Sequence, residues 1–195
     1  MTDLYVEAIH RFQNLLGRAM QTDLPDPTAM TVATVDGAGN PSIRTILLKG
    51  IDERGFVFYT NTLSRKGGQL AARPRVALCF FWQPLKEQVN VEGWVEAVAP
   101  EEADAYWASR PRESQIGGWA SWQSEPLASR HELMERYARF EARFAGRDVP
   151  RPVHWSGYRV VPDRIEFWTA GAHRLHQRVL YEKGPDGWHT HLLNP

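Results

Sequence analysis

The sequence predicts a mainly β protein of the α+β class, an antiparallel barrel decorated with helices, and three observations support this fold class. About seven or eight short segments have the apolar and β-branched pattern of strands. Most of these segments are joined by tight turns rich in Gly, Asn, Asp and Pro. The 195 residues contain no repeat or linker and can form one sizeable core. We expect a single domain over residues 1–195, with a helical segment at 1–26 and a helical insertion at 100–148.

The first expected element is an amphipathic helix that Thr2 or Asp3 can cap. Pro25 and Pro27 follow it and end the helical pattern. Its buried face is defined by apolar side chains at helical spacing, namely Tyr5, Ile9, Phe12, Leu16 and Met20.

Strand signals follow in two groups, one before the helical insertion and one after it. Turn sequences such as 37–40, 52–55 and 184–187 separate neighbouring segments. We expect strands at residues 29–36, 42–49, 56–61, 76–82, 88–99, 157–169, 175–182 and 188–193.

Three further helices are expected. One starts at Ser64, a good N-cap residue, and stops before Pro74. The second begins at Pro100, which suits a first-turn position, and stops near Arg110 because Pro111 disfavours α geometry in the residue before it. The third covers residues 129–144.

Composition narrows the class of protein. Lys plus Arg and Asp plus Glu each number 23, so the net charge is zero, which argues against a nucleic-acid coat or a membrane-surface protein. The single Cys79 cannot form an internal disulfide, and this fits a reducing compartment. The apolar run at 76–82 is too short to span a bilayer, and the first residues do not resemble a signal peptide. We expect a cytoplasmic protein.

A first cluster of candidate residues is basic. Arg44 and Lys49 belong to one expected strand, and Ser64, Arg65 and Lys66 begin the following helix. The free N–H groups of a helix start, its positive dipole end and two cationic side chains favour a phosphate. The alternative is a solvated basic pair on the surface.

A second cluster combines a phenol, a guanidinium and a hydroxyl. Tyr106 and Arg110 lie four residues apart on one helix face, and Ser114 follows the break at Pro111, where it can cap the next turn. Such groups at a helix start also suit a phosphate. The alternative is a helix end satisfied by local capping.

A third cluster is EFWTAGAHRLHQR, residues 166–178. On an extended strand Arg174, His176 and Arg178 point to one face. The aromatic pair before them, Phe167 and Trp168, is expected to be buried. A face of this composition is a poor core and a good anion site. Gln123 and Ser124 are further polar candidates.

No metal site is expected, because the histidine pairs 173/176 and 189/191 lack a third ligand at a suggestive spacing. The phosphate-binding GxxxxGK loop, the GxGxxG turn and the GxSxG elbow are absent from the sequence. Two phosphate clamps imply two phosphorylated ligands or one ligand with two phosphates, and spacing alone leaves both open.

Four motifs in this order closely resemble the pyridoxine/pyridoxamine 5′-phosphate oxidase family, and the resemblance runs from about residue 27 to 195. They are RTILLK (44–49), FYTNTLSRKGGQL (58–70), SRPRESQIGGWASWQS (109–124) and EFWTAGAHRLHQR (166–178). The resemblance implies a split β-barrel that is an obligate homodimer, with flavin mononucleotide (FMN) at the subunit interface.

The resemblance also implies roles for individual residues. The positions that match substrate contacts are Lys49, Tyr106, Arg110 and Ser114 for the phosphate, and Arg174, Leu175 and His176 for the pyridine ring, with Arg174 and His176 as the catalytic pair. The positions that match FMN contacts, some reaching across the dimer, are Arg44, Thr45, Ile46, Leu47, Leu48, Lys49, Tyr59, Thr60, Arg65, Lys66, Gln88, Gln123, Ser124, Trp168 and Arg178.

The implied activity is oxidation of pyridoxine 5′-phosphate and pyridoxamine 5′-phosphate to pyridoxal 5′-phosphate by dioxygen, with release of hydrogen peroxide, and of ammonia from the amine. An oxidase of the same fold that acts on another flat substrate, such as the phenazine-pathway relatives, should lose the Tyr106–Arg110–Ser114 clamp. A non-catalytic flavin- or haem-binding barrel would have no reason to keep Arg174 and His176.

The sequence departs from the family pattern at three places. Gln177 stands where the family usually has Asp, and Glu87 stands where it usually has Arg. An N-terminal Arg-x-x-Tyr segment, which closes over the substrate in some members, is not visible before the first helix. These differences concern the substrate more than the flavin.

Overall fold

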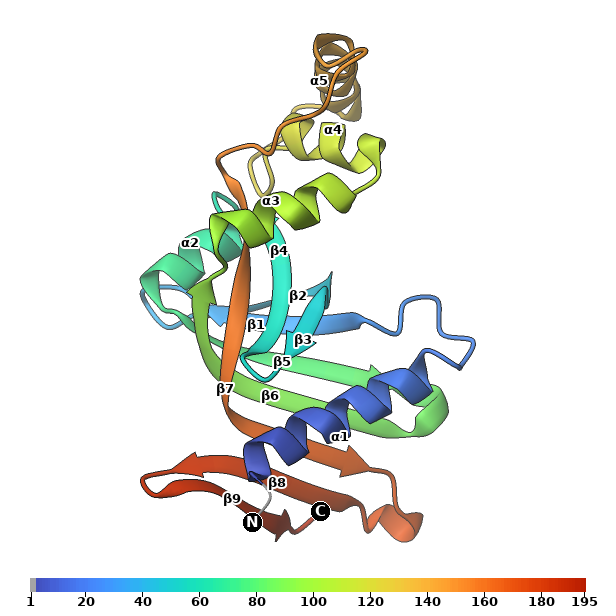
Figure 1. Ribbon diagram of the computed structural model, residues 1–195, viewed down its shortest axis with the longest axis vertical. Helices are drawn as coiled ribbons and strands as arrows, with labels where there is room; N and C mark the ends of the chain where they lie inside the picture. The colour runs from blue at the N-terminus through green and yellow to red at the C-terminus, as the bar shows by residue number, and fades with distance from the viewer. Residues whose placement is uncertain (1–2) are drawn as a thin grey trace.

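The computed structural model describes residues 3–195 and contains one antiparallel sheet, with the opening helix packed against the sheet and a group of helices at one end of the molecule (Figure 1). Within these residues nine strands follow the order β2-β1-β5-β6-β7-β4-β3, and β8 and β9 continue from β7. The strands are β1 (Ala29–Val35), β2 (Pro41–Leu47), β3 (Gly50–Asp52), β4 (Gly55–Asn61), β5 (Arg75–Trp82), β6 (Glu87–Ala97), β7 (Trp155–Thr169), β8 (Gln177–Gly184) and β9 (Gly187–Leu193).

The opening helix is α1 (Leu4–Ala19), and Asp3 caps it by accepting a hydrogen bond from the Tyr5 N–H. Its apolar face packs into the barrel, where the Phe12 ring contacts Phe56 and Phe80 edge-on. Met20 was expected on this face, but it is the C-cap residue and is 57% exposed. Thr2, the other predicted cap, lies outside the described residues.

The long strand β7 connects the two ends of the molecule. Its first half pairs with β4, its second half pairs with β8, and β6 runs beside most of its length. The main core lies between this sheet and α1, and it includes Phe56, Phe58, Val89, Ile165 and Phe167. The barrel that the sequence predicts is therefore built around β6 and β7.

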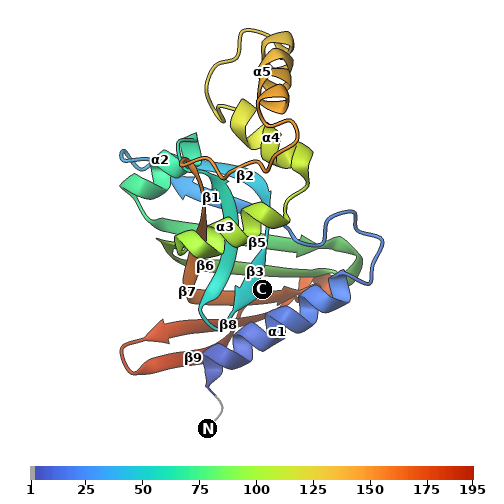
Figure 2. The same ribbon diagram turned by 45° about the horizontal axis from the view of Figure 1, so that its top comes forward.

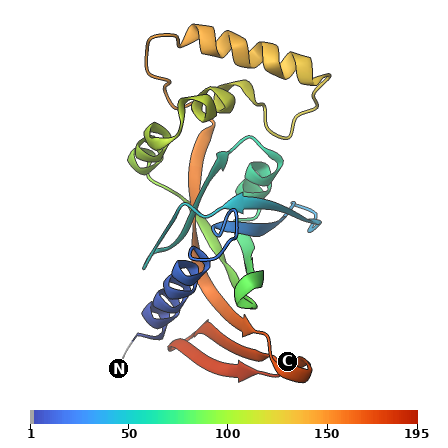
Figure 3. The ribbon, with the colours of Figure 1, turned by 90° about the vertical axis from the view of Figure 1, so that its right-hand side faces the viewer.

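The chain between β6 and β7 is helical, as expected, and it forms α3 (Pro100–Ser109), α4 (Arg112–Ala120) and α5 (Arg130–Arg143). Figures 1 and 2 place these helices at the end of the molecule opposite β8 and β9, and in Figure 3 α5 lies across that end. They share a second apolar cluster, with Trp107, Ile116, Phe144 and Trp155 at its centre. None of the helices within residues 3–195 is long and apolar enough to cross a membrane.

Three boundaries differ from the sequence predictions for local reasons. The strand expected at 42–49 stops at Leu47, and a separate strand, β3, follows it. Ser114 does not cap α4, since the helix begins at Arg112 with Pro111 as N-cap and Ser114 lies inside its first turn. The strand expected at 175–182 begins only at Gln177, because a 3₁₀ turn, η2 (Ala172–Arg174), precedes it.

Candidate ligand-binding site

A cavity of about 480 Å³ lies where β2 and β4 meet the α3–α4 segment, and its volume suits a small molecule. It brings together residues from two of the predicted clusters that are far apart in the chain. Its lining includes Lys49, Tyr59, Thr60, Lys66 and Gln123 from the predicted cofactor set, and Tyr106, Arg110 and Ser114 from the predicted substrate set.

The short helix α2 (Arg65–Ala72) places Lys66 at the cavity. Ser64 caps the helix as predicted, because its hydroxyl accepts a hydrogen bond from the Gly67 N–H. The Lys66 ammonium donates to three neutral acceptors, the hydroxyls of Thr60 (2.6 Å) and Ser64 (3.2 Å) and the Gln123 amide oxygen (2.8 Å). Burial, and then the nearby Arg44 charge, lower the pKa of Lys66 to about 8. A buried ammonium with only neutral partners favours an anion beside it.

Arg44 and Arg65 do not line the cavity, but they add positive charge beside Lys66. The Arg44 guanidinium donates to the hydroxyls of Thr34 (2.6 Å) and Ser42 (2.8 Å). Burial, and then the Arg65 charge, lower the pKa of Arg44. The ion pairs found within residues 3–195 involve neither of these arginines nor Lys66. We call these three residues the α2 cation cluster.

Arg110 is the second cationic feature of the cavity. Its guanidinium lies over the Trp107 and Trp155 rings, 5.0 and 4.7 Å from their centroids, and burial lowers its pKa. Its Nη1 is buried and has no hydrogen-bond partner within the described chain. Buried polar atoms are nearly always bonded, so this nitrogen is suited to an anionic ligand.

Stacked aromatic rings form part of the cavity lining. Tyr59 and Tyr106 stack with centroids 4.0 Å apart and planes 10° apart, and Trp155 stacks on Tyr59 at 5.5 Å. Trp155 was not among the predicted site residues. The two glycines of the sequence SQIGGWAS also line the cavity, and a Cβ at Gly118 would lie 2.8 Å from the Trp107 ring. A Cβ at Gly117 would meet nothing within 4 Å, so Gly118 alone is the sequence signal for this close packing.

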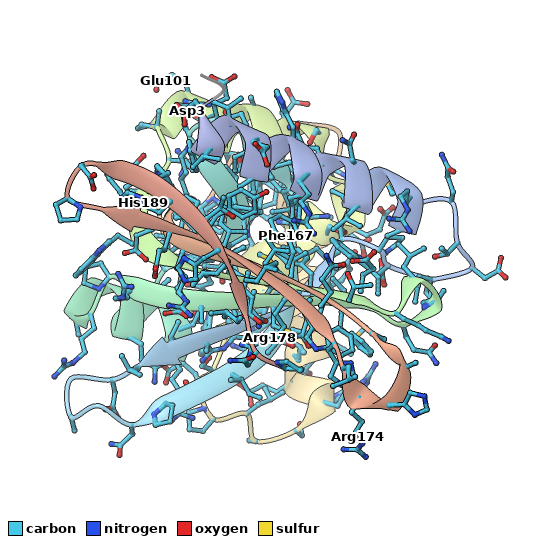
Figure 4. All side chains as sticks on the ribbon, turned by 90° about the horizontal axis from the view of Figure 1, so that it is seen from below. Asp3, Glu101, Phe167, Arg174, Arg178 and His189 are labelled. Atoms are coloured by element: carbon cyan, nitrogen blue, oxygen red, sulfur yellow. The ribbon has the colours of Figure 1, made fainter. Side chains whose placement is uncertain are left out.

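A further group of predicted residues lies at the other end of the molecule. Gln88, Trp168 and Arg178 are directly opposite one another on β6, β7 and β8, so they share one face of the sheet. Arg178 is already paired, since its guanidinium donates to both carboxylate oxygens of Glu166 at 2.7 and 3.0 Å. Figure 4 shows Arg178 along the sheet and Arg174 projecting from the edge.

The prediction that Arg174, His176 and Arg178 share one face of a strand is wrong. Only Arg178 belongs to β8, whereas Arg174 ends η2 and His176 follows that turn. The backbone of His173 and Arg174 is left-handed, with φ of 56° and 63°, and this interrupts the two-residue alternation of a strand. Phe167 is fully buried as expected, but Trp168 is only partly buried.

Four other predicted residues lie outside the cavity lining. Leu48 is buried in the main core, so its side chain serves packing. Thr45 lies in β2, opposite Thr31 of β1. Ser124 is exposed with a φ of 76°, and Leu175 is 71% exposed beside the η2 turn.

A split antiparallel barrel in which stacked rings and the cations Lys66 and Arg110 surround one cavity is typical of a class of proteins that bind flat, phosphorylated molecules. The chain belongs to the pyridoxamine 5′-phosphate oxidase family. The family model described as pyridoxamine 5′-phosphate oxidase matches residues 16–144, and the one described as the pyridoxine 5′-phosphate oxidase C-terminal dimerisation region matches residues 155–195.

Individual proteins give the same relationship. The pyridoxine/pyridoxamine 5′-phosphate oxidase of Myxococcus xanthus (strain DK1622) is 58% identical over 189 residues, which is 97% of this chain and 92% of the relative. The crystal structure of PhzG from Burkholderia lata 383, in complex with tetrahydrophenazine-1-carboxylic acid, has a TM-score of 0.91 at 32% identity and covers 96% of this chain and 92% of its own. An FMN-binding protein from Nostoc punctiforme (97% and 95% covered) shares the fold, with a TM-score of 0.69 at 18% identity.

Proposed function

We propose that the chain is an FMN-dependent oxidase that converts pyridoxine 5′-phosphate and pyridoxamine 5′-phosphate to pyridoxal 5′-phosphate, with dioxygen as acceptor. The observation that carries this proposal is the presence of two separate cationic features at one cavity. The α2 cation cluster suits one phosphate, and Arg110 with Lys49 suits a second. A flavin mononucleotide and a phosphorylated pyridine each bring one such group.

The residues at α2 fit the cofactor. A phosphate beside the start of α2 would receive charge-assisted hydrogen bonds from Arg44, Arg65 and Lys66, and would be attracted by the helix dipole. A bound flavin would supply the redox chemistry that the side chains lack, namely two-electron oxidation at the exocyclic carbon of the substrate with dioxygen as the final acceptor. The protein itself supplies orientation, charge and exclusion of water.

The residues of α3 and α4 fit the substrate phosphate. The orphaned Nη1 of Arg110 would gain an acceptor, and the Tyr106 and Ser114 hydroxyls and Lys49 line the same cavity. Binding of a remote phosphate stabilises ground state and transition state equally, and it holds the reacting carbon in place.

We further propose that the site is completed by a second copy of the chain. Gln88, Trp168, Arg178, Arg174 and His176 lie at the end of the molecule opposite α3 and α4 (Figure 1), so one chain cannot offer all the predicted contacts to one ligand. The C-terminal family model is that of a dimerisation region. A two-fold dimer would bring the C-terminal end of one chain to the cavity of its partner.

The sheet has a face that suits this dimer. On β2, β1 and β5 the residues Ile43, Ala33 and Ala77 lie opposite one another, and the next row along the same face includes Thr31 and Cys79. Ile43 is 71% exposed in the single chain. We call these five uncharged residues the outer face. They line a hollow of about 300 Å³ that is bordered by Glu92, Arg164 and Glu166. We propose that the partner covers this face, because an exposed apolar patch with a polar rim is typical of a protein interface.

The decisive experiment is peroxide release on adding pyridoxine 5′-phosphate to FMN-reconstituted protein. The purified protein should be yellow, and it should have twice the chain mass in solution. The similarity to PhzG favours a phenazine precursor as a second candidate substrate, so a tetrahydrophenazine carboxylic acid is tested in parallel. Turnover of the phenazine compound alone would overturn the proposal, and so would a colourless monomer that cannot bind FMN. The predicted location of the reaction is the cytoplasm.

A further inference from the structure

The connection between β7 and β8 has an unusual backbone. His173 and Arg174 are consecutive non-glycine residues with left-handed φ angles of 56° and 63°. Side chains disfavour this region, so such a conformation persists only where surrounding contacts impose it. Residues held in this way are concentrated at functional sites. The turn is therefore suited to fix the position of the neighbouring His176.

Two backbone hydrogen bonds between neighbouring residues hold this turn closed. The Leu175 N–H donates to the Ala172 carbonyl at 3.0 Å, and the His176 N–H donates to the Arg174 carbonyl at 2.9 Å. Gly171 opens the turn, and a Cβ at this position would overlap the Leu175 carbonyl oxygen. Only glycine therefore permits this path of the chain.

The same glycine contacts the His176 ring. The Gly171 backbone N–H donates to Nδ1 of His176 at 3.2 Å, and the Trp168 ring lies against the imidazole with centroids 4.7 Å apart. A backbone N–H can only donate, so Nδ1 must carry its lone pair here. In a neutral imidazole the hydrogen then sits on Nε2, which can only donate.

We propose that Gly171 is a positioning residue that fixes the tautomer of His176, so that this imidazole presents Nε2–H to an acceptor atom on the substrate ring. In this state His176 orients the ring and does not take up a proton. The inference deepens the proposed function and rests on it, because it assigns a direction to one hydrogen bond at that site.

The tautomer can be measured without turnover. Two-bond ¹H–¹⁵N correlation spectra of FMN-loaded protein labelled at its seven histidines distinguish a protonated ring nitrogen from an unprotonated one, and the His176→Gln spectrum identifies the His176 signals. The proposal expects an unprotonated Nδ1 and a protonated Nε2 before substrate is added. A hydrogen on Nδ1 in the resting protein would overturn it. The proposed function is tested separately, by peroxide release from the wild-type protein.

A matched pair of variants tests the same hydrogen bond by its effect on kcat. The Gln amide nitrogen reaches about as far as Nε2, whereas the Asn amide nitrogen stands near the position of Nδ1. His176→Gln should keep kcat within about tenfold of wild type, as expected for a hydrogen bond that is weakened but still made. His176→Asn should lose about 100-fold through misplacement of the ring. If Asn retains as much kcat as Gln, or if both are as inactive as His176→Ala, His176 is not an Nε2–H donor.

Gly171→Ala tests the positioning role directly. The added methyl group forces the turn open, so Nδ1 loses its donor and the spectra should show both tautomers. We expect kcat to fall about 100-fold, while flavin occupancy and the KM for the phosphorylated substrate stay near wild type. Gly17→Ala is the control, because a Cβ there meets open space on α1 and should change nothing. A Gly171→Ala protein that retains both a single Nε2–H tautomer and the wild-type kcat contradicts the proposal.

Discussion

Lys66 and Arg110, which line the cavity, make no ion pair within residues 3–195, whereas Arg178 at the β8 end is paired with a carboxylate. Arg110 keeps a buried nitrogen without a partner, and Lys66 donates only to neutral oxygens. Arg178, in contrast, makes two hydrogen bonds to Glu166. Unpaired buried charge is tolerated where a ligand neutralises it. The comparison indicates that the cavity end supplies positive charge for binding phosphates, and that the β8 end supplies rigidly held side chains that orient a ligand.

The largest expected effect comes from a variant that prevents dimer formation, because the cavity end of one chain then cannot meet the β8 end of its partner. Ile43→Asp puts a charge in the apolar part of the outer face, which the proposed partner would bury. We expect monomers that bind little FMN and have no measurable oxidase activity, as followed by analytical ultracentrifugation and flavin absorbance. Val153→Asp is the matched control, because Val153 is 99% exposed and precedes β7, away from this face. An active Ile43→Asp dimer would show that the partner sits elsewhere.

The next effect separates the two cationic features of the cavity. Arg110→Ala removes a charged hydrogen bond to the substrate phosphate, worth about 1.5–3 kcal/mol, so the KM should rise roughly 10- to 150-fold. Flavin occupancy should stay high. Arg65→Ala should do the reverse, with weaker FMN binding and a KM near wild type at saturating FMN. Loss of FMN from the Arg110→Ala protein together with an unchanged KM would mean that Arg110 binds the cofactor phosphate and not the substrate phosphate.

A smaller effect depends on pH through Lys66. Its pKa of about 8 in the free protein means that the ammonium is lost as pH rises through that value. Affinity of the apoprotein for FMN should therefore fall above pH 8, by at most about tenfold per pH unit for one proton. Because the folded pKa lies below the ordinary value of 10.5, this group makes the free energy of unfolding of the apoprotein rise between about pH 8 and 10.5.

Fluorescence titrations of FMN between pH 6.5 and 9.5 measure this slope. The Lys66→Arg variant is the control, since a guanidinium keeps its charge throughout the range. Equal slopes in the two proteins would assign the pH dependence to another group.

The smallest effect concerns the cap of α2. Ser64→Ala should lower the free energy of unfolding by about 1 kcal/mol, and it should also weaken FMN binding because Lys66 loses one acceptor. Ser129→Ala removes the equivalent cap of α5, where the Ser129 hydroxyl accepts from the Glu132 N–H at 3.1 Å. It should cost similar stability in chemical denaturation and leave FMN binding unchanged. If both variants weaken FMN equally, the cap acts only through general stability.

The residues at the cavity end could be predicted from the sequence by the rules of helix geometry. Ser64 is a strong N-cap residue, and four-residue spacing puts Tyr106 and Arg110 on one face, so both features follow from helix geometry. The η2 turn could not be derived in this way. A period of two assumes continuous extended backbone, and the left-handed pair His173–Arg174 depends on packing around Gly171. Trp155 was missed as well, because it reaches the cavity from a strand that starts 45 residues after Arg110.

Because β7 is long, dimers assembled from two different variant chains should show which chain contributes to which site. Its 15 residues run roughly 45 Å at the usual rise of a strand, with Trp155 at the cavity at one end and Trp168 near His176 at the other. In the proposed dimer each chain therefore contributes one end of β7 to each of two different sites. A mixed dimer of Arg110→Ala and His176→Asn chains would hold one doubly damaged site and one intact site. At substrate concentrations well below the wild-type KM we expect it to recover half of the wild-type activity, although both parent dimers have little activity under these conditions. Differently tagged chains allow the mixed dimer to be isolated. Without such recovery, both contributions to a site would have to come from the same chain.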